Sequence, residues 1–535
     1  MIRPRHRTAL LLAAAFVLCV YGLMWGLPNA FDFAQDSVVP TGKLAQHGFA
    51  FETVTAYRYP PAHFILLRLV FVPVRLLARL PVFAGNEKME ATLFILAARL
   101  ISVAMAVGTV WIIFLLGRRF WNETTGYAAA LLSILSPLTL YYAKNANLDI
   151  PYVFWLALTL FVYVRILQEN RERDYLWLGI LAALAVTTKD QAYAFLALMP
   201  VPLIWNLFRR RENEPPPERR LARLATGAAA FLVVFALIHN LLFDWGGFVR
   251  HVKTILGPGS EGWRLFESGP AGQARLFVET ALRFLDAWTP AGVVLAGLGA
   301  ALALRRGENR RIAVALLTPI VSYYILFLAV IGYVPTRFVL PILLVGCLFA
   351  GRGFAWLWEK TRPRPLAGQV VAAGLTAWVA LAGLSVDFVM ANYSRYHAQK
   401  WLESRVPAEK RICWIGDMRD MPRFNKPLDP KPCEPTARAV AETRADMLVV
   451  SLPQEDPAGG VRSTRLSSIA RRNLGGWGLT DAEKRRRAER SLMQHLVGGE
   501  LGYTVSEKFT SSIAPFVPEV CESLNRTIVI LEKEP

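Results

Sequence analysis

The chain has 535 residues, of which 54% are hydrophobic and 19% are charged, and its formal net charge is +19. Soluble proteins are about 25% charged and about 45–50% apolar. Long apolar runs recur through residues 1–388, whereas residues 389–535 have an ordinary soluble composition, which excludes a soluble multidomain enzyme, a disordered chain and a disulfide-rich scaffold. We therefore predict a mainly α fold, with a polytopic helical membrane bundle in residues 1–388 and a small C-terminal α/β domain in residues 389–535.

Eleven membrane-spanning helices are predicted from apolar runs in the sequence, since a span needs about 20 apolar residues. They lie near 8–27, 91–117, 124–142, 149–168, 175–188, 190–208, 225–243, 279–304, 312–332, 335–358 and 368–388. The first run follows three arginines, as a signal peptide would, but no small-residue cleavage site comes after it. We therefore interpret it as a span.

Basic residues determine the predicted orientation. With the N-terminus inside, the cytoplasmic segments together hold 22 Lys and Arg; they are 1–7, 118–122, 165–174, 209–223, 305–311 and 352–364. The short loops on the other side hold one basic residue each, namely Lys144, Lys189 and Arg337. This positive-inside pattern predicts a cytoplasmic N-terminus and an outer C-terminal domain. The net charge is then a topology signal, and no basic run interleaved with aromatic residues indicates a nucleic-acid partner.

The long first outer loop, residues 28–89, opens with Phe31-Asp32-Phe33-Ala34-Gln35-Asp36. Two acids four residues apart, just beyond a span, are candidates for general-base chemistry at the membrane surface. A helix N-cap or a solvated loop carboxylate is the plainer interpretation of either acid. The spacing is compatible with both interpretations.

The same loop continues with two prolines and an apolar stretch over residues 60–80. Arg68, Arg75 and Arg79 fall on one face of this stretch at helical spacing. The pattern predicts an amphipathic helix in the membrane interface, kinked or divided at Pro73. A twelfth span is the alternative, but three arginines in lipid would be costly.

Three further outer elements carry polar residues that membrane insertion does not require. Asp149 begins a predicted span shortly after Lys144, either as a carboxylate in an outward-facing cleft or as a complement to the helix dipole. Lys189-Asp190 interrupts a long apolar run, either as functional residues or as a hairpin tip with a snorkelling lysine. Arg337 suits phosphate binding, or is an ordinary interface arginine. A second long outer segment covers residues 244–278.

The tail, residues 389–535, has an alternating pattern that predicts a small α/β domain. Helices are expected at 396–403 and 436–444, and strands at 411–415, 446–451 and 526–531, while 453–500 receives no assignment. Cys413 and Cys433 are a plausible disulfide on the outer side, where oxidation is possible, and Cys521 is left over. No Cys or His spacing suggests zinc. We expect the tail to be structural or related to the acceptor.

The predicted topology places one set of ionisable residues on the outer side: Asp36, Arg58, Lys144, Asp149, Lys189 and Arg337. Two carboxylates and several cations at one interface suit an anionic lipid headgroup and a nucleophile that must lose a proton. The sequence contains no Walker motif, no GxGxxG after a strand and no HExxH, so ATP-driven transport and zinc proteolysis are unsupported.

The order of these features resembles the bacterial members of the GT-C superfamily of glycosyltransferases, such as the protein O-mannosyltransferase-like and aminoarabinose-transferase-like enzymes. The matching elements are Gln35-Asp36-Ser37, Tyr57-Arg58-Tyr59-Pro60-Pro61, Asn147-Leu148-Asp149-Ile150-Pro151, Thr188-Lys189-Asp190-Gln191, Arg337-Phe338-Val339-Leu340-Pro341 and Tyr396–Leu402. The family's usual Asp-Glu pair is Asp36-Ser37 here, which weakens a two-carboxylate metal site. We therefore assign no metal ligand and no certain cofactor, and leave a divalent metal open.

The resemblance implies an inverting glycosyltransferase of a bacterial inner membrane, which uses a polyprenyl-phosphate sugar among the membrane lipids and an unknown acceptor. Asp36 would be the general base, and Asp149 would orient sugar hydroxyls or Lys144. Arg58, Tyr59, Lys144, Lys189 and Arg337 would bind the donor and its phosphate. A flippase or transporter for lipid-linked substrates is the alternative, although the sequence shows no convincing repeat. A structural or assembly protein is a third hypothesis.

Overall fold

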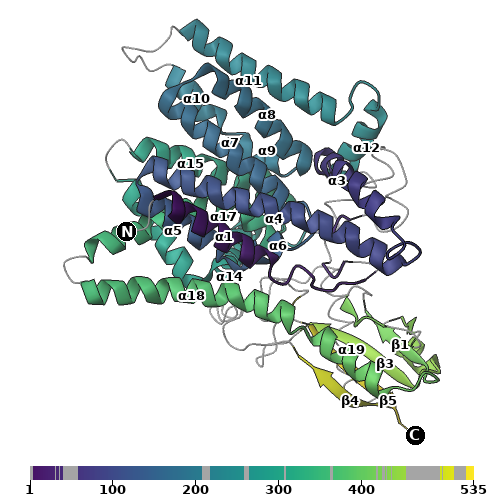
Figure 1. Ribbon diagram of the computed structural model, residues 1–535. Helices are drawn as coiled ribbons and strands as arrows, with labels where there is room; N and C mark the ends of the chain where they lie inside the picture. Colours follow the sequence, from purple (N-terminus) through teal and green to yellow (C-terminus); the bar gives the residue numbers. More distant parts are fainter. Residues whose placement is uncertain are drawn as a thin grey trace.

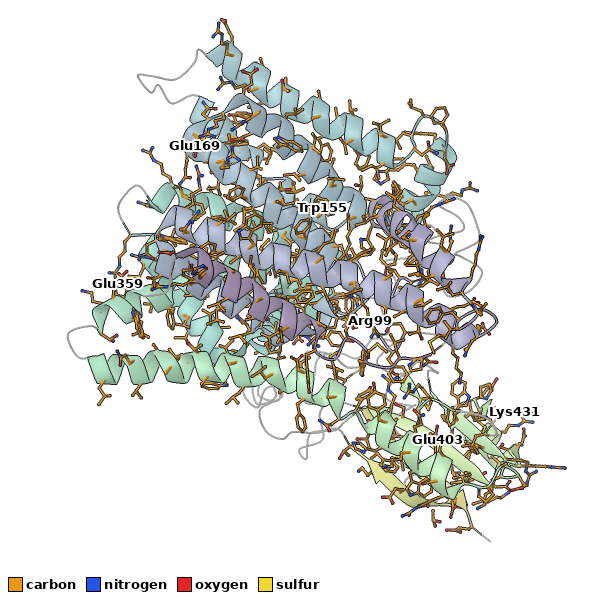
Figure 2. The ribbon with its side chains drawn as sticks, viewed as in Figure 1. Arg99, Trp155, Glu169, Glu359, Glu403 and Lys431 are labelled. Carbon is orange, nitrogen blue, oxygen red and sulfur yellow. A yellow bond between two sulfur atoms is a disulfide. The ribbon has the colours of Figure 1, made fainter. Side chains whose placement is uncertain are left out.

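The computed structural model describes residues 4–29, 32–34, 37–39, 58–207, 217–257, 264–305, 309–361, 365–416, 420–424, 428, 430–434, 436–453, 495–496, 498–499, 501–510, 524 and 526–534. Long helices lie side by side in one bundle, and a small sheet lies beyond one end of it (Figure 1). We call this the sheet end; the N-terminus lies at the opposite end. Arg99 lies toward the sheet end, whereas Glu169 and Glu359 lie at the opposite end (Figure 2).

The first half of the bundle contains helices from α1 to α11. Their bounds are α1 Pro4–Val20, α3 Ala62–Ala78, α4 Glu87–Phe120, α5 Glu123–Ile134, α6 Pro137–Ala143, α7 Asp149–Glu169, α8 Glu172–Thr188, α9 Ala192–Leu196, α10 Pro200–Leu207 and α11 Pro217–Ile238. Side-chain caps begin two of them, because Asn86 accepts from Met89 N before α4 and Asn122 accepts from Thr125 N before α5.

The second half continues from α12 to α19. The bounds are α12 Trp245–Leu256, α14 Pro270–Ala303, α15 Asn309–Tyr323, a π-helical turn Tyr324–Leu328, α16 Ala329–Ile331, a 3-10 turn Thr336–Val339, α17 Leu340–Lys360, α18 Pro365–Ala391 and α19 Ser394–Arg405. Helix α14 is kinked at Thr289, whose φ is +74°, immediately before Pro290. A proline disfavours helical backbone in the residue before it.

Seven helical stretches in the described part are long and apolar enough to cross a membrane: Glu87–Phe120, Asp149–Glu169, Leu221–Ile238, Pro270–Ala303, Arg310–Ile331, Thr336–Lys360 and Gly368–Arg405. The predicted span 124–142 is a pair of helices, α5 and α6, bent by 64°. The predicted spans 8–27, 175–188 and 190–208 correspond to shorter helices. The protein is a multi-pass membrane protein, and the number of eleven spans stays a prediction.

Glycines allow two helix pairs in the bundle to pack closely. A Cβ on Gly299 of α14 would overlap the carbonyl of Phe349 of α17, and one on Gly353 of α17 would overlap that of Leu295. Gly179 of α8 meets Gly227 of α11 in the same way. Small residues at such contacts let backbones approach and gain packing energy, which is the main attraction between helices in lipid.

Helix α3 confirms the helix expected over residues 60–80. It runs without a break through Pro73, so that proline does not divide it. Its buried face packs on α4 and includes His63, Phe64, Leu67, Phe71 and Val74. Its position in the membrane interface stays a prediction.

The tail contains a five-stranded sheet with the order β2-β1-β3-β5-β4. The strands are β1 Ile412–Ile415, β2 Lys431–Pro432, β3 Met447–Pro453, β4 Tyr503–Phe509 and β5 Arg526–Lys533, and α20 covers Ala437–Glu442. Strand β1 is parallel to β2 and β3, while β5 is antiparallel to β3 and β4. The three predicted strands and the Cys413–Cys433 disulfide are confirmed. Cys521 lies outside the described residues.

Candidate functional site

Asp149 and Lys189 form a buried ion pair at the start of α7. Lys189 follows the last residue of α8, and its Nζ donates to Asp149 Oδ1 at 2.6 Å. Asn147 fixes the other carboxylate oxygen, because its Nδ2 donates to Asp149 Oδ2 at 3.1 Å, and it also accepts from Asp149 N at 3.1 Å. Both oxygens of the carboxylate are therefore engaged, and the hairpin after α8 is tied to the first turn of α7.

Aromatic rings and Arg337 surround this pair. Lys189 Nζ lies 5.1 Å from the ring centre of Tyr152 and 5.8 Å from that of Phe338. These distances are within the range of cation–π attraction. The guanidinium of half-buried Arg337 lies over the ring of Phe338 at 5.6 Å. We call Asp149, Tyr152, Lys189, Arg337 and Phe338 the Lys189 cluster. Asp149, Lys189 and Arg337 were predicted site residues, whereas Tyr152 and Phe338 were not.

The segment after the first acidic motif lies beside the segment that carries Asp149. The backbone N–H of Val38 donates to the carbonyl of Ala146 at 2.8 Å. Val38 is two residues after Asp36, and Ala146 is three residues before Asp149. Asp36 itself lies outside the described residues. The two predicted catalytic acids are thus on chain segments that are hydrogen-bonded to one another close to each acid.

Asp32, the other acid of that motif, pairs with a residue that the sequence did not single out. Its Oδ1 lies 2.6 Å from Arg99 Nη2, and both side chains are buried. Arg99 also donates to the carbonyl of Leu23, so it joins α4 both to the chain just after α1 and to Asp32. The available signal was an arginine inside the predicted span 91–117, because such residues usually have a specific partner.

Lys144 is fully buried and pairs with Asp387 near the end of α18. The pairing of Lys144 with Asp387 differs from the sequence hypothesis that Asp149 orients Lys144, since the partner of Asp149 is Lys189. Asp387 also lies inside a predicted span, 368–388, so it carried the same signal as Arg99. The pair joins the end of α6 to the helix that leads into the tail.

Arg58 and Tyr59 precede α3. Arg58 is exposed, whereas Tyr59 packs against an apolar cluster that includes Phe64, Ala146 and Leu148. Helix α3 and Tyr59 therefore contact the segment that ends at Asp149. The predicted donor-binding residue Tyr59 therefore packs in the same apolar cluster as Leu148, the residue before Asp149, while Arg58 lies at the surface.

Residues 244–278, predicted as the second long outer segment, contain a helix that was not expected from the sequence, α12. His251 of α12 lies buried, and its Nε2 is 3.0 Å from Asp190 Oδ1. Asp190 follows Lys189 directly, so α12 contacts the hairpin at the residue next to Lys189. An apolar pattern over only 12 residues was the available signal.

Among the described side chains, no group of three or more His, Cys, Asp or Glu is arranged to hold a metal ion. The predicted Asp36 lies outside that set. Residue Ser37, which stands where the resembling family has a second acid, supplies a hydroxyl instead of a carboxylate. We assign no metal ligand and derive no step through a metal.

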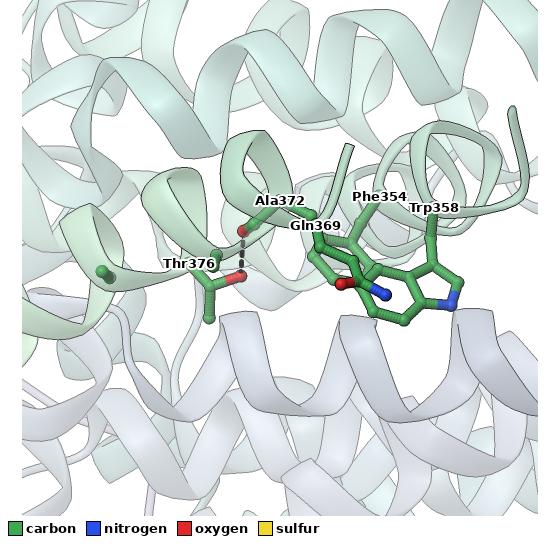
Figure 3. A pocket seen from close by; sticks show the side chains of 7 residues that line it. Phe354, Trp358, Gln369, Ala372 and Thr376 are labelled. Carbon is green, nitrogen blue, oxygen red and sulfur yellow. Dashed lines mark hydrogen bonds between the residues drawn. The ribbon is translucent and has the colours of Figure 1, made fainter. Parts of the chain in front are cut away.

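A separate apolar cavity of about 540 Å³ lies between α17 and α18 (Figure 3). Phe354, Trp358, Gln369 and Thr376 line it, and Thr376 donates to the carbonyl of Ala372 at 2.8 Å. Phe354 is 17 residues beyond Arg337, which is about 25 Å along the helix at about 1.5 Å per residue. The cavity is therefore remote from the Lys189 cluster.

A protein-family model matches residues 94–245, which include Asp149 and Lys189. Its description is dolichyl-phosphate-mannose-protein mannosyltransferase. This match confirms the resemblance to GT-C glycosyltransferases. No curated protein sequence matches the chain.

Several solved structures are similar to this chain. ArnT from Cupriavidus metallidurans bound to undecaprenyl phosphate is 12% identical with a TM-score of 0.48, over 99% of this chain and 98% of that chain. The archaeal oligosaccharyltransferase AglB from Archaeoglobus fulgidus, in complex with an inhibitory peptide and a dolichol-phosphate, is 14% identical with a TM-score of 0.39, over 78% of this chain. The match spans 63% of AglB, less than two thirds of its length. Mycobacterial arabinofuranosyltransferase AftD is 12% identical with a TM-score of 0.42, over 100% of this chain and 40% of that chain.

Proposed function

We propose that this protein is an inverting glycosyltransferase that takes a hexosyl or pentosyl group from a polyprenyl-phosphate donor. The acceptor is a lipid, glycan or protein, and transfer takes place on the outer face of the membrane that holds the protein. The observation that carries the proposal is the Val38–Ala146 hydrogen bond, which links the segment after Asp36 to the segment before Asp149. Lys189 pairs with Asp149, three residues beyond Ala146, and both Lys189 and Arg337 face the ring of Phe338. The matched family, by its description, uses a lipid-phosphate sugar donor.

In this proposal Asp36 is the general base. It takes the proton of the acceptor hydroxyl or amine while the acceptor attacks the anomeric carbon from the face opposite the phosphate, so the configuration inverts. The bond between the anomeric carbon and the phosphate oxygen breaks, and its electron pair stays on the polyprenyl phosphate. Lys189, Arg337 and Arg58 stabilise that growing negative charge.

Asp149 has a positioning role in this scheme. Its two oxygens are engaged by Lys189 and Asn147, which suits a carboxylate that fixes the direction of a lysine. Tyr59 would contact the donor next to this segment. The pairing of Lys144 with Asp387 suits a role in holding the end of α6.

We further propose that residues 1–388 form the transferase domain in a bacterial inner membrane, with a cytoplasmic N-terminus, and that residues 389–535 form an extracytoplasmic domain. The Cys413–Cys433 disulfide supports this orientation, because disulfides persist in oxidising compartments. The positive-inside pattern supports it independently.

The test is sugar transfer from labelled polyprenyl-phosphate donors by the full-length protein in nanodiscs, with candidate acceptors supplied in parallel. We expect transfer with inverted configuration, which Asp36→Asn abolishes without loss of membrane insertion. Glu409→Gln, an exposed tail carboxylate, is the matched control and should retain activity. Movement of the intact donor across the bilayer without sugar transfer would favour the flippase instead, and full activity of Asp36→Asn would remove that residue from the role.

A further inference from the structure

The tail makes specific contacts with the chain just after the first helix. The hydroxyl of Tyr396 in α19 accepts a hydrogen bond from Gly26 N at 2.7 Å. Arg423 donates to the carbonyl of Pro28 at 3.2 Å. These partners are more than 360 residues apart in the sequence, so the contacts are made by the tail as it folds against the bundle.

Arg395 makes a third and deeper contact. Its side chain is fully buried, and its guanidinium carbon lies 3.7 Å from the ring centre of Phe33 and 4.4 Å from that of Tyr393. Cations attract aromatic faces strongly when both groups are removed from water. Gly26, with φ of +77°, leaves room for the Phe33 ring, because a Cβ there would overlap it.

The other side of the same segment is held by the bundle. Asp32 pairs with Arg99 of α4, and it accepts from Ala34 N at 3.0 Å. Arg395 of α19 therefore contacts Phe33, and Arg99 of α4 pairs with its neighbour Asp32. Phe33 precedes Asp36 by three residues.

We infer that Tyr396 and Arg395 of the tail are positioning residues that hold residues 26–29 and 32–34, the described part of the chain that precedes Asp36 in the sequence. This inference rests on the proposed function for the role of Asp36. The tail is then part of the scaffold of the site. Loosening this contact misplaces the base but leaves the Lys189 cluster, which belongs to α7, α8 and the turn before α17, unchanged.

If these residues position the base, their loss should lower kcat and leave the donor KM nearly unchanged. A displacement of about 1 Å in a catalytic group can cost about 10²-fold in rate. We expect Tyr396→Phe, which removes one hydroxyl and keeps the ring, to lower kcat by about tenfold and to change the donor KM by less than about twofold. Arg395→Met should lower kcat further, and Arg395→Lys should restore part of the loss, since lysine keeps the cation.

The experiment uses the full chain in nanodiscs and has two readouts. One is the kcat and donor KM of each variant, and the other is backbone hydrogen exchange of residues 23–34. Lys400→Gln, an exposed residue on the same helix, is the matched control and should change neither. If Arg395→Met does not fold, Tyr396→Phe carries the test.

Faster exchange in residues 23–34 together with a lower kcat and an unchanged donor KM supports the inference. Unchanged exchange, an unchanged kcat, or an equal loss of donor affinity in Tyr396→Phe would overturn it. Asp36→Asn is measured in parallel, so that the two ideas can fail separately. A fully active Asp36→Asn refutes the base, whereas the exchange and kcat of Tyr396→Phe still decide whether the tail positions the loop.

Discussion

Lys189 offers a quantitative test of the proposed chemistry. Only 11% of its side chain is exposed, and its Nζ lies 2.6 Å from Asp149 Oδ1. In the proposed reaction its charge stabilises the leaving phosphate. Removal of one preorganised donor to a developing oxyanion costs about 10²–10³ in kcat. We therefore expect Lys189→Gln to lower kcat by about this factor.

The same substitution should also change stability. Removing one partner of a buried ion pair costs about 3–5 kcal/mol, because the remaining charge is uncompensated. Asn147 still donates to Asp149 in Lys189→Gln, so we expect the lower end, about 3 kcal/mol. The double variant Lys189→Gln with Asp149→Asn has no unpaired charge. It should regain most of the lost stability and none of the lost activity.

Thermal unfolding and single-turnover sugar transfer in the same nanodiscs separate these effects. Lys400→Gln removes an exposed lysine and should resemble the unmodified protein in both assays. A double variant that regains activity along with stability would show that Lys189 serves the fold and does not act on the phosphate. A single variant that keeps kcat within about threefold would refute the electrostatic role outright.

Other parts of the molecule give further tests. Reduction of Cys413–Cys433, which closes a 20-residue separation, should destabilise the sheet by about 3 kcal/mol and speed hydrogen exchange there. Hydrogen bonds from Arg411 lower the pKa of Asp446 to about 2, so their contribution to stability is present above about pH 4 and is lost as the pH falls toward 2. Asp446→Asn should flatten this acid dependence in a thermal-unfolding series. Asp387→Asn should lower the unfolding temperature of the whole bundle, since it leaves a buried lysine unpaired.

Local pattern sufficed to predict most elements. The apolar runs at 149–168 and 335–358 correspond to α7 and to the 3-10 turn with α17, and the buried-strand run at 446–451 corresponds to β3. Such segments are specified by their own periodicity and length. Strand β4 was missed because it is an edge strand whose side chains are mostly exposed. The 12 residues of α12 lie well below the length of a span.

The ion pairs could be predicted only in part. The sequence indicated that Lys144, Asp149 and Lys189 were unusual, but it did not give their partners. Asp387 is 243 residues from Lys144, and the two are brought together by the packing of α18 on α6. One-dimensional spacing carries no information about such distances. Lys189 was nevertheless visible as a charge that interrupts a long apolar run, and Asp387 as a charge inside the predicted span 368–388.

The contacts of Asp149 bear on its role in the proposed mechanism. Each oxygen of Asp149 already accepts a hydrogen bond, one from Lys189 and one from Asn147, so part of its capacity to accept a proton from the acceptor is occupied. This favours Asp36 as the base and Asp149 as the residue that aims Lys189. An acceptor whose nucleophilic group ionises by itself at the assay pH needs no base. Such an acceptor should therefore restore activity to Asp36→Asn. It should leave Asp149→Asn impaired, because a Lys189 that Asp149 no longer orients does not stabilise the charge on the leaving phosphate. If that acceptor restored activity to both variants, both Asp36 and Asp149 would contribute to removal of the acceptor proton, which contradicts this division of roles.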